Sequence, residues 1–330
     1  MPPAPGSSAI DRALSPELTE RFTAALAWLW PPHADPAARL ALAVSGGPDS
    51  LALLLLAHAT LPGRIAAATV DHGLRAESAD EAAAVAAICA DLGVPHRTLP
   101  VQLDPGNVQA EARAARYAAL AGWMEKEGLT ALATAHHADD QAETLLLRLN
   151  RASGVAGLAG VRPLAPVPGT RLPLLRPLLD WRRADLAAIV VAAGLTAADD
   201  PSNRDDRFDR ARLRKHLAAA DWIDIPALAA SAAHLADADA ALDWAARREW
   251  DEAVTRGPLG LTYRPQAPRA IALRVLARIL RELDGAEPRG GVLARLFDSL
   301  VARQPMSVGN LVARVMPEGW TFTKAPPRRN

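Results

Sequence analysis

A glycine-rich segment with the sequence SGGPDS occupies residues 45–50 and comes directly before a run of leucines. Adjacent glycines let a backbone turn sharply and approach a phosphate closely, and the free N–H groups at the start of the following helix favour negative charge. The segment is not a Walker loop, because no Gly-Lys-Ser or Gly-Lys-Thr follows and the nearest lysine is Lys126. We expect an anion site here, although a tight turn with Asp49 or Ser50 as an ordinary helix cap would use the same residues.

A second group of polar residues lies in the segment HHADDQAET, residues 136–144. His136, Asp140 and Glu143 are spaced i, i+4 and i+7 and therefore share one side of a helix. Zinc usually takes more nitrogen or sulfur ligands, so carboxylates that face an anion site indicate magnesium or an ammonium group. Plain capping of an acidic helix start is the simpler alternative.

Arginines supply positive charge in three further segments. Arg113, Arg116 and Tyr117 recur at helical spacing in NVQAEARAARY, although a solvated helix face would show the same pattern. Residues 203–216 combine five arginines and one lysine with three aspartates. A weaker stripe at i, i+4 and i+7 consists of Arg274, Arg278 and Arg281. The last two sets are candidate contacts for nucleic-acid phosphates.

The elements that position these residues alternate between strand and helix patterns from residue 39 to about 151. We expect strands at 40–44, 65–70, 96–101 and 131–135, with helices at 50–59, 77–92 and 108–127 between them. This order predicts an α/β fold with a Rossmann-like parallel sheet. Ligands bind such sheets at the carboxyl ends of the strands, where the polar segments lie.

The chain after this region changes character. A fifth strand is expected within 172–179, and Asp180 is expected to cap a helix over 181–193. Helices at 226–255, 268–283 and 291–303, with a strand pair within 311–323, predict a smaller, mainly helical domain. We place the boundary near Leu217, so the domains are 1–217, with a core at 39–217, and 218–330.

Composition restricts the classes of protein that fit. The 330 residues carry 37 basic and 37 acidic side chains, so a nucleic-acid partner must be met by a local patch. A single cysteine, Cys89, excludes zinc ribbons and CxxC redox schemes, and core packing is its expected role. No apolar run is long enough for a membrane span and no secretory signal is evident, so a cytoplasmic location without membrane contact is expected.

The segments SGGPDS, VDHGLR, QAEARAARY, HHADDQAET and DPSNRDDRFDRARLR resemble, in order and spacing, the tRNA(Ile)-lysidine synthetase family of ATP pyrophosphatases, or PP-loop proteins. The resemblance spans residues 40–217. It implies an ATP- and Mg²⁺-dependent ligase that joins L-lysine to the wobble cytidine of tRNA(Ile) with a CAU anticodon. An adenylated cytidine would form with release of pyrophosphate and then AMP, and decoding would change from Met to Ile. The C-terminal domain would bind tRNA.

The resemblance also implies roles for individual residues. The catalytic candidates are Asp49, Arg116, Asp140 and His136, of which Asp49 and Asp140 are also the Mg²⁺ candidates. The nucleotide-binding candidates are Ser45, Gly46, Gly47, Pro48, Asp49, Ser50, Asp71 and His72. The candidates for lysine or tRNA binding are Arg113, Asp140, Glu143, Asn203, Arg210, Arg212 and Arg214. Ala211 stands where the family usually has asparagine, and Asn203 is a candidate substitute for that amide.

Two other functions fit parts of the sequence. A small-molecule ligase of the same superfamily would share the loop but not VDHGLR followed by HHADDQAET. An RNA-binding module with an inactive nucleotide loop is disfavoured by the intact SGGPDS segment. Release of pyrophosphate that depends on tRNA would separate these alternatives. The sequence leaves the oligomeric state open, with a homodimer as one option.

Overall fold

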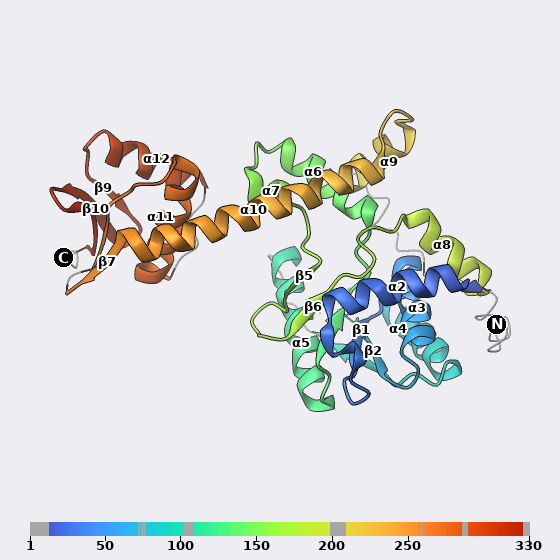
Figure 1. The fold of residues 1–330 in the computed structure, drawn as a ribbon. Coiled ribbons are helices and arrows are strands. Elements are labelled where there is room, and N and C mark those ends of the chain that lie inside the picture. Colours follow the sequence, from blue (N-terminus) through green and yellow to red (C-terminus); the bar gives the residue numbers. More distant parts are fainter. Residues whose placement is uncertain are drawn as a thin grey trace. The chain divides into compact units, whose positions relative to one another are not determined.

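The computed structural model describes residues 13–71, 73, 77–101, 108–198, 209–258, 260–285 and 290–325. The chain divides into two compact units, Met1–Leu235 and Ala236–Asn330, within helix α10 (Ile225–Ala253). Figure 1 shows the ribbon of both units and labels many of their elements. The expected functional boundary near Leu217 stays a prediction.

A six-stranded sheet forms the centre of the first unit, in the order β3-β2-β1-β4-β6-β5. Neighbouring strands from β3 to β6 run parallel, and β5 pairs antiparallel with β6. The predicted α/β fold is thereby confirmed. The strands are β1 (Leu40–Ala43), β2 (Ile65–Asp71), β3 (His96–Pro100), β4 (Ala131–Ala133), β5 (Leu164–Pro166) and β6 (Pro173–Leu175).

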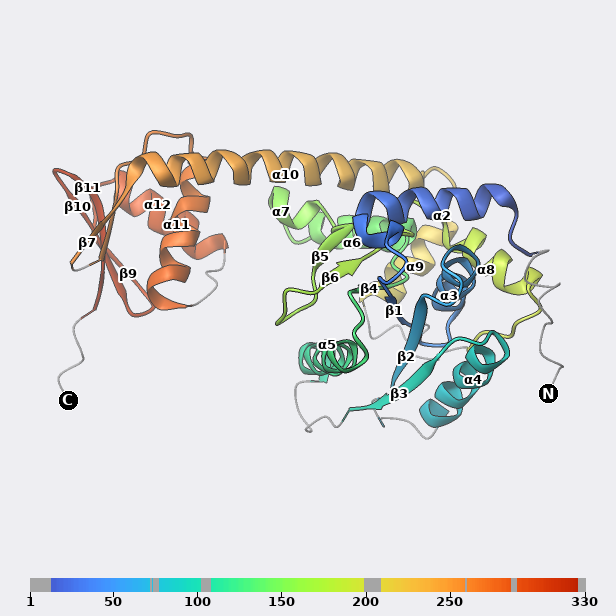
Figure 2. The same ribbon diagram turned by 60° about the horizontal axis from the view of Figure 1, so that its bottom comes forward.

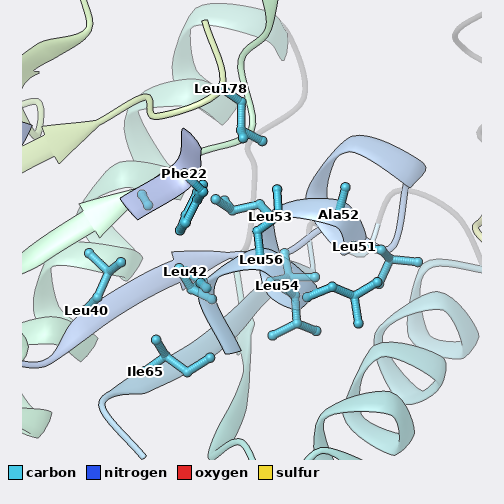
Figure 3. Packing of buried hydrophobic residues seen from close by; sticks show 14 of the residues in the cluster. Phe22, Leu40, Leu42, Leu51, Ala52, Leu53, Leu54, Leu56, Ile65 and Leu178 are labelled. Carbon is cyan, nitrogen blue, oxygen red and sulfur yellow. The ribbon is translucent and has the colours of Figure 1, made fainter. Parts of the chain in front are cut away.

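Helices cover both faces of this sheet, because successive strand residues point to opposite sides. Leu40 and Leu42 of β1 belong to one buried cluster, whereas Ala41 belongs to another. The first cluster, part of which Figure 3 shows, includes residues of α2 (Pro16–Leu29), α3 (Pro48–Thr60), α4 (Glu77–Asp91) and α8 (Arg183–Ala192). The second is built on α5 (Val108–Glu127), which lies on the other side of the strands in Figure 2.

The start of α8 corrects one prediction. Asp180 does not cap this helix, because its carboxylate pairs with Arg21 of α2 at 3.0 Å. The helix begins at Arg183, whose backbone N–H donates to the carboxylate of Asp139 at 2.8 Å. The cap is therefore supplied by a residue distant in sequence. Helix α2 itself was not among the expected elements, although it buries Phe22 against the sheet.

The first unit also contains helices that follow the sheet strands in the chain. They are α6 (Ala138–Leu149), α7 (Val155–Leu158) and α9 (Asp209–Ala219), with the short 3₁₀ helix η1 (Pro31–Ala34) after α2. Leu217 and Ile223, on either side of the α9–α10 turn, pack against Ala138 and Ala142 of α6. This contact holds α9 beside α6.

The second unit contains more strand than the sequence predicted. Its three expected helices are present as α10, α11 (Arg269–Asp284) and α12 (Gly290–Val301). The expected strand pair forms the hairpin β10 (Leu311–Met316) and β11 (Gly319–Lys324), within a five-stranded sheet of order β7-β8-β11-β10-β9. The additional strands are β7 (Val254–Gly257), β8 (Gly260–Tyr263) and β9 (Met306–Val308).

These added strands are short, and two of them have no clear alternation of buried and exposed residues. The sheet is held by an aromatic core instead, in which Trp320 makes edge contacts with Tyr263 and Phe297 at 5.8 and 5.6 Å between ring centroids. In the described parts of the chain, no helix is both long enough and apolar enough to cross a membrane.

Candidate active site

The SGGPDS segment forms a tight turn between β1 and α3. Gly46 has a φ of +85°, and a Cβ at this position would also lie 3.2 Å from a methyl carbon of Val85. Glycine is therefore required at this point of the turn. Gly47 is the N-cap residue and Pro48 the first residue of α3, where the lack of an N–H has no cost.

Two serine hydroxyls hold the loop from inside. The buried hydroxyl of Ser50 donates to the carbonyl of Gly47 at 3.0 Å and accepts from the backbone N–H of Ser45 at 3.1 Å. The hydroxyl of Ser45 lies 3.2 Å from that of Ser50. The carbonyl of Gly46 accepts from Ala198 at 2.9 Å, which anchors the loop to the segment after α8. These hydrogen bonds fix the conformation of the loop, and the Ser50 side chain positions the backbone of residues 45 and 47.

Helix α6 carries the HHADDQAET segment and begins with a reciprocal cap. The His137 ring accepts from the backbone N–H of Asp140 at 3.3 Å, and the Asp140 carboxylate accepts from the N–H of His137 at 3.2 Å. The other ring nitrogen of His137 lies 3.4 Å from the carboxylate of Asp49 and 3.6 Å from that of Asp140. His137 therefore connects the loop to α6.

The side chain of His137 is 2% exposed, and three carboxylates surround its buried imidazole. Burial alone would lower its pKa, but the hydrogen bond to Asp49 and the negative charges of Asp140 and Asp139 outweigh burial and raise the pKa. The ring thus keeps affinity for a proton among three carboxylates.

A cavity of about 1260 Å³ opens where the loop and α6 face each other. This arrangement follows from the strand order, because β1 and β4 are parallel neighbours and both carboxyl ends reach the same rim. The predicted residues that line the cavity are Ser45, Gly47, Pro48, Asp49, Ser50, Arg116, His136, Asp140, Arg210 and Arg214. The fold thus collects residues from four separate segments.

The residues at this rim fit a magnesium ion. The Oδ1 atom of Asp49 is buried and has no hydrogen-bond partner, which is costly unless a ligand satisfies it. Asp140 lies near the same ring nitrogen of His137. Mg²⁺ in phosphate-transfer sites typically binds one or two carboxylates together with substrate oxygens and water. Among the described residues no group of three or more His, Cys, Asp or Glu could form a complete metal cage.

Glu143 is fully engaged with α9. Its side chain is 2% exposed and accepts two bonds from Arg214, at 2.7 and 3.1 Å, and another from Arg210. Arg210 also donates to Asp140 at 2.7 Å. Burial would raise the pKa of Glu143, but its bonds to Arg214 and Arg210 hold the pKa below its usual value. The predicted role of Glu143 in lysine binding stays a prediction.

His136 lines the cavity, and its ring lies 3.0 Å from the hydroxyl of Thr134. Burial lowers the pKa of His136 to about 4; Asp140 opposes this shift, whereas Arg176, Arg113 and Arg210 add to it. His136 is therefore a neutral imidazole at physiological pH.

The two arginines of α5 lie over the same aromatic ring. Arg113 and Arg116 are 5.1 and 5.3 Å from the ring centroid of the buried Tyr117. Arg116 lines the cavity together with Tyr117, whereas Arg113 is absent from the lining. The expected pairing of Arg113 and Tyr117 on one helix face is thus present.

Four other predicted residues lie apart from the cavity or outside the described residues. Asp71 is absent from the lining, and its carboxylate accepts from Gly73 at 2.9 Å and from the hydroxyl of Ser78 at 2.7 Å, so it connects the end of β2 to the first turn of α4. Arg212 is exposed and pairs with Asp209 at 2.6 Å. His72 and Asn203 lie outside the described residues. Ala211, which departs from the family pattern, is buried and lines the cavity.

The sequence analysis did not select His137, Asp139 or Arg183. Asp139 binds the guanidinium of Arg182 at 3.2 Å as well as the N–H of Arg183, so the HHADD segment also holds the start of α8. Arg183 lines the cavity. The sequence signal that could have indicated these residues is the adjacent pairs at 136–137, 139–140 and 182–183. Spacing alone does not say which member of each pair faces the site.

Comparisons with known proteins agree with this geometry. A PP-loop domain matches residues 17–220. The tRNA(Ile)-lysidine synthase of Novosphingobium aromaticivorans is 49% identical over 300 residues, which cover 90% of this chain and 92% of that protein. The tRNA(Ile)-lysidine synthase of Zymomonas mobilis is 40% identical over 297 residues, which cover 88% and 90%.

One solved structure shares the fold. The U34-tRNA thiolase NcsA from Methanococcus maripaludis is 17% identical and superposes with a TM-score of 0.52 over 66% of this chain and 76% of that chain. Fold, loop and domain match together define the class as PP-loop ATP-binding enzymes. Within that class the chain belongs to the tRNA(Ile)-lysidine synthase family, and it is a ligase. The family resemblance seen in the sequence is thus confirmed.

Proposed function

We propose that this enzyme ligates L-lysine to C2 of the wobble cytidine of tRNA(Ile) with a CAU anticodon, using ATP. The product would be lysidine, and decoding would change from Met (AUG) to Ile (AUA). The observation that carries the proposal is the cavity shared by the loop at 45–50 and the Asp140 carboxylate of α6, in a chain 49% identical to a lysidine synthase.

The first step is adenylation of the cytidine. The C2 oxygen attacks the α-phosphorus of ATP, and the bond from that phosphorus to pyrophosphate breaks. The rigid loop at 45–50 presents backbone N–H groups to the departing pyrophosphate, and Arg116 lies in the cavity wall to stabilise charge on the phosphate oxygens. Asp49 and Asp140 would hold Mg²⁺, which neutralises the phosphates when bound.

The second step forms the carbon–nitrogen bond. The ε-amine of lysine attacks C2, and the former C2 oxygen leaves with AMP. The amine must first lose a proton, and Asp140 or His136 is within the cavity to accept it. Because the pKa of His136 is about 4, this imidazole can accept a hydrogen bond or relay a proton but does not retain one at neutral pH.

The tRNA would approach through the basic helix α9. Arg210, Arg214 and Lys215 line the cavity, and the exposed Arg212 extends the positive face outward. Phosphate contacts of this kind position a nucleic acid without reading its sequence. The tRNA-binding role of the C-terminal domain, the homodimer and the cytoplasmic location stay predictions.

The decisive experiment measures pyrophosphate release from ATP and Mg²⁺ with CAU-anticodon tRNA(Ile), with and without lysine, followed by mass analysis of the wobble nucleoside. We expect release that requires tRNA and a mass gain that requires lysine. Asp49→Asn should reduce release by about 100-fold or more, because it weakens the Mg²⁺ and phosphate site. Asp180→Asn, an exposed carboxylate in the same unit, is the matched control and should have no effect.

The other outcomes are equally informative. Release without the mass gain would contradict lysine as the nucleophile while keeping the adenylation step. Absence of tRNA-dependent release would contradict the proposed function as a whole.

A further inference from the structure

The cavity holds more positive charge than the family motifs account for. A PP-loop lacks the lysine with which a Walker loop contacts the terminal phosphates of a nucleotide. The pyrophosphate charge must therefore be met by cations other than a loop lysine, and Arg116 and Mg²⁺ leave room for a further contributor. The cationic residues in the cavity lining are Arg116, Arg183, Arg210, Arg214 and Lys215.

Two of these cations bind carboxylates, and one lies over an aromatic ring. Arg210 and Arg214 bind Glu143, and Arg210 also binds Asp140. Arg116 lies over the ring of Tyr117 at 5.3 Å. Lys215, also on α9, has interactions of its own. The guanidinium of Arg183 differs, because it has no hydrogen-bond or ion-pair partner among the described residues.

The backbone of Arg183 is nevertheless fixed beside the loop. Its N–H donates to Asp139 at 2.8 Å, and Asp139 lies 3.7 Å from the ring of His137. That ring in turn lies 3.4 Å from Asp49 in the first turn of α3. Arg183 is thus connected through two side chains to the loop end of the cavity.

We propose that Arg183 binds the β- and γ-phosphates of ATP and the pyrophosphate that leaves. This inference rests on the proposed function and adds a phosphate-binding residue to it. A guanidinium suits the task, because its planar donors match phosphate oxygens and its charge does not titrate. The absence of a carboxylate partner leaves those donors available for the ligand.

The test compares ligand affinities by calorimetry without tRNA, for wild-type protein and for Arg183→Ala and Arg183→Lys. The ligands are ATP with Mg²⁺, inorganic pyrophosphate with Mg²⁺, and AMP. We expect Arg183→Ala to weaken ATP and pyrophosphate binding by about 10- to 100-fold and to leave AMP binding unchanged. Arg183→Lys, which keeps the charge and is the variant less liable to misfold, should lose less.

Arg171 provides the matched control. It is an exposed arginine between β5 and β6 in the same unit, without a partner among the described residues and outside the cavity lining. Arg171→Ala should leave all three affinities unchanged. Equal losses for AMP and ATP in Arg183→Ala, or unchanged ATP and pyrophosphate affinity, would overturn the proposal.

A tRNA phosphate is the rival ligand for this arginine. In that case Arg183→Ala would keep its ATP affinity and instead weaken tRNA binding, with a salt slope lower by about one. That outcome would also overturn the proposal. Because the calorimetry needs neither tRNA nor lysine, it tests Arg183 even if tRNA-dependent pyrophosphate release fails.

Discussion

Helices α9 and α11 carry arginines at the same spacing, and the two pairs meet different surroundings. In α9, Arg210 and Arg214 bind carboxylates of α6 and still line the cavity. In α11, Arg274 is bound by Asp239 and Asp243 of α10, and Arg278 lies over the ring of Trp250 at 3.9 Å. The α11 pair is absent from the cavity lining.

The difference shows that the role of an arginine pair on a helix depends on the residues that contact it. The α9 pair orders a site wall, because its carboxylate partners belong to the helix that also contacts Asp49 through His137. The α11 pair joins two helices of the second unit. Both sets were candidate RNA contacts, the first on its excess of positive charge and the second on its spacing, and we now expect that role only of α9.

The largest expected effect comes from removing the buried acceptor of α9. Glu143→Gln should lower the free energy of unfolding by about 3–5 kcal/mol, because two arginines lose a buried charged partner. It should also reduce tRNA-dependent pyrophosphate release by about 100-fold through displacement of α9. Urea unfolding and a pyrophosphate assay measure the two effects.

Asp239→Asn in the second unit is the matched comparison. It should also lower stability, because Asp239 is a buried partner of Arg274, but pyrophosphate release should not change. Equal losses of activity in the two variants would contradict the separation of the two clusters.

Buried acids should distinguish the two units at high pH. Burial raises the pKa of Cys89 to about 12 in the first unit, and burial with the charge of Glu249 raises the pKa of Tyr263 in the second. Folding raises the pKa of both groups, so each neutral side chain contributes fully to the free energy of unfolding at low pH. That contribution falls once the pH passes the pKa of the group in the unfolded chain, which is about 8.5 for cysteine and 10 for tyrosine.

Raising the pH from 7 to 10 should therefore cost about 2 kcal/mol through Cys89 and much less through Tyr263. Cys89→Ala should remove most of this pH-dependent loss in urea unfolding, whereas Tyr263→Phe should leave it nearly intact. The reverse result would show that the thiol is not the group that limits alkaline stability.

A smaller effect is expected from the Arg278 contact. Arg278→Ala should lower the unfolding free energy by about 1 kcal/mol, because the cation leaves the face of the largely buried Trp250. Arg278→Lys should retain part of that energy. Thermal unfolding followed by tryptophan fluorescence measures the difference, and identical curves for all three proteins would show that the contact contributes nothing.

The smallest expected effects concern tRNA affinity. Arg274→Gln and Arg278→Gln should leave both the affinity for tRNA and its salt slope unchanged, since both charges are satisfied within the second unit. Arg212→Gln in α9 should lower the slope by about one, because Arg212 is exposed and its pair with Asp209 is weak in water. A lower slope in the α11 variants would restore that stripe as an RNA contact.

Much of the fold could be predicted because its signals are local. The strands at 40–44 and 65–70 are short apolar runs, and the helix expected at 108–127 matches α5. The cap of α8 could not be predicted, since Asp139 lies more than forty residues before Arg183. The added strands of the second unit were missed because they are short, and because two of them have no clear alternation of buried and exposed residues.

The site could be predicted at the level of its segments and less well residue by residue. The loop at 45–50 and the α6 carboxylates were found because glycines and helical spacing have direct steric and geometric consequences. His137 was missed because the sequence contains two adjacent histidines, and only the packed structure decides which ring reaches Asp49.

By itself, the sequence determined the glycine-rich loop, the alternating parallel fold and the family, because each depends on residues close together in the chain or on a fixed order of motifs. The tertiary structure decided which charged side chains are paired within the protein and which remain available to a ligand. Glu143 is held by two arginines and Arg274 by two aspartates, whereas the guanidinium of Arg183 is held by none of the described carboxylates. The reason is physical: an ion pair depends on distances of a few ångströms, and those distances exist only once separate segments pack together.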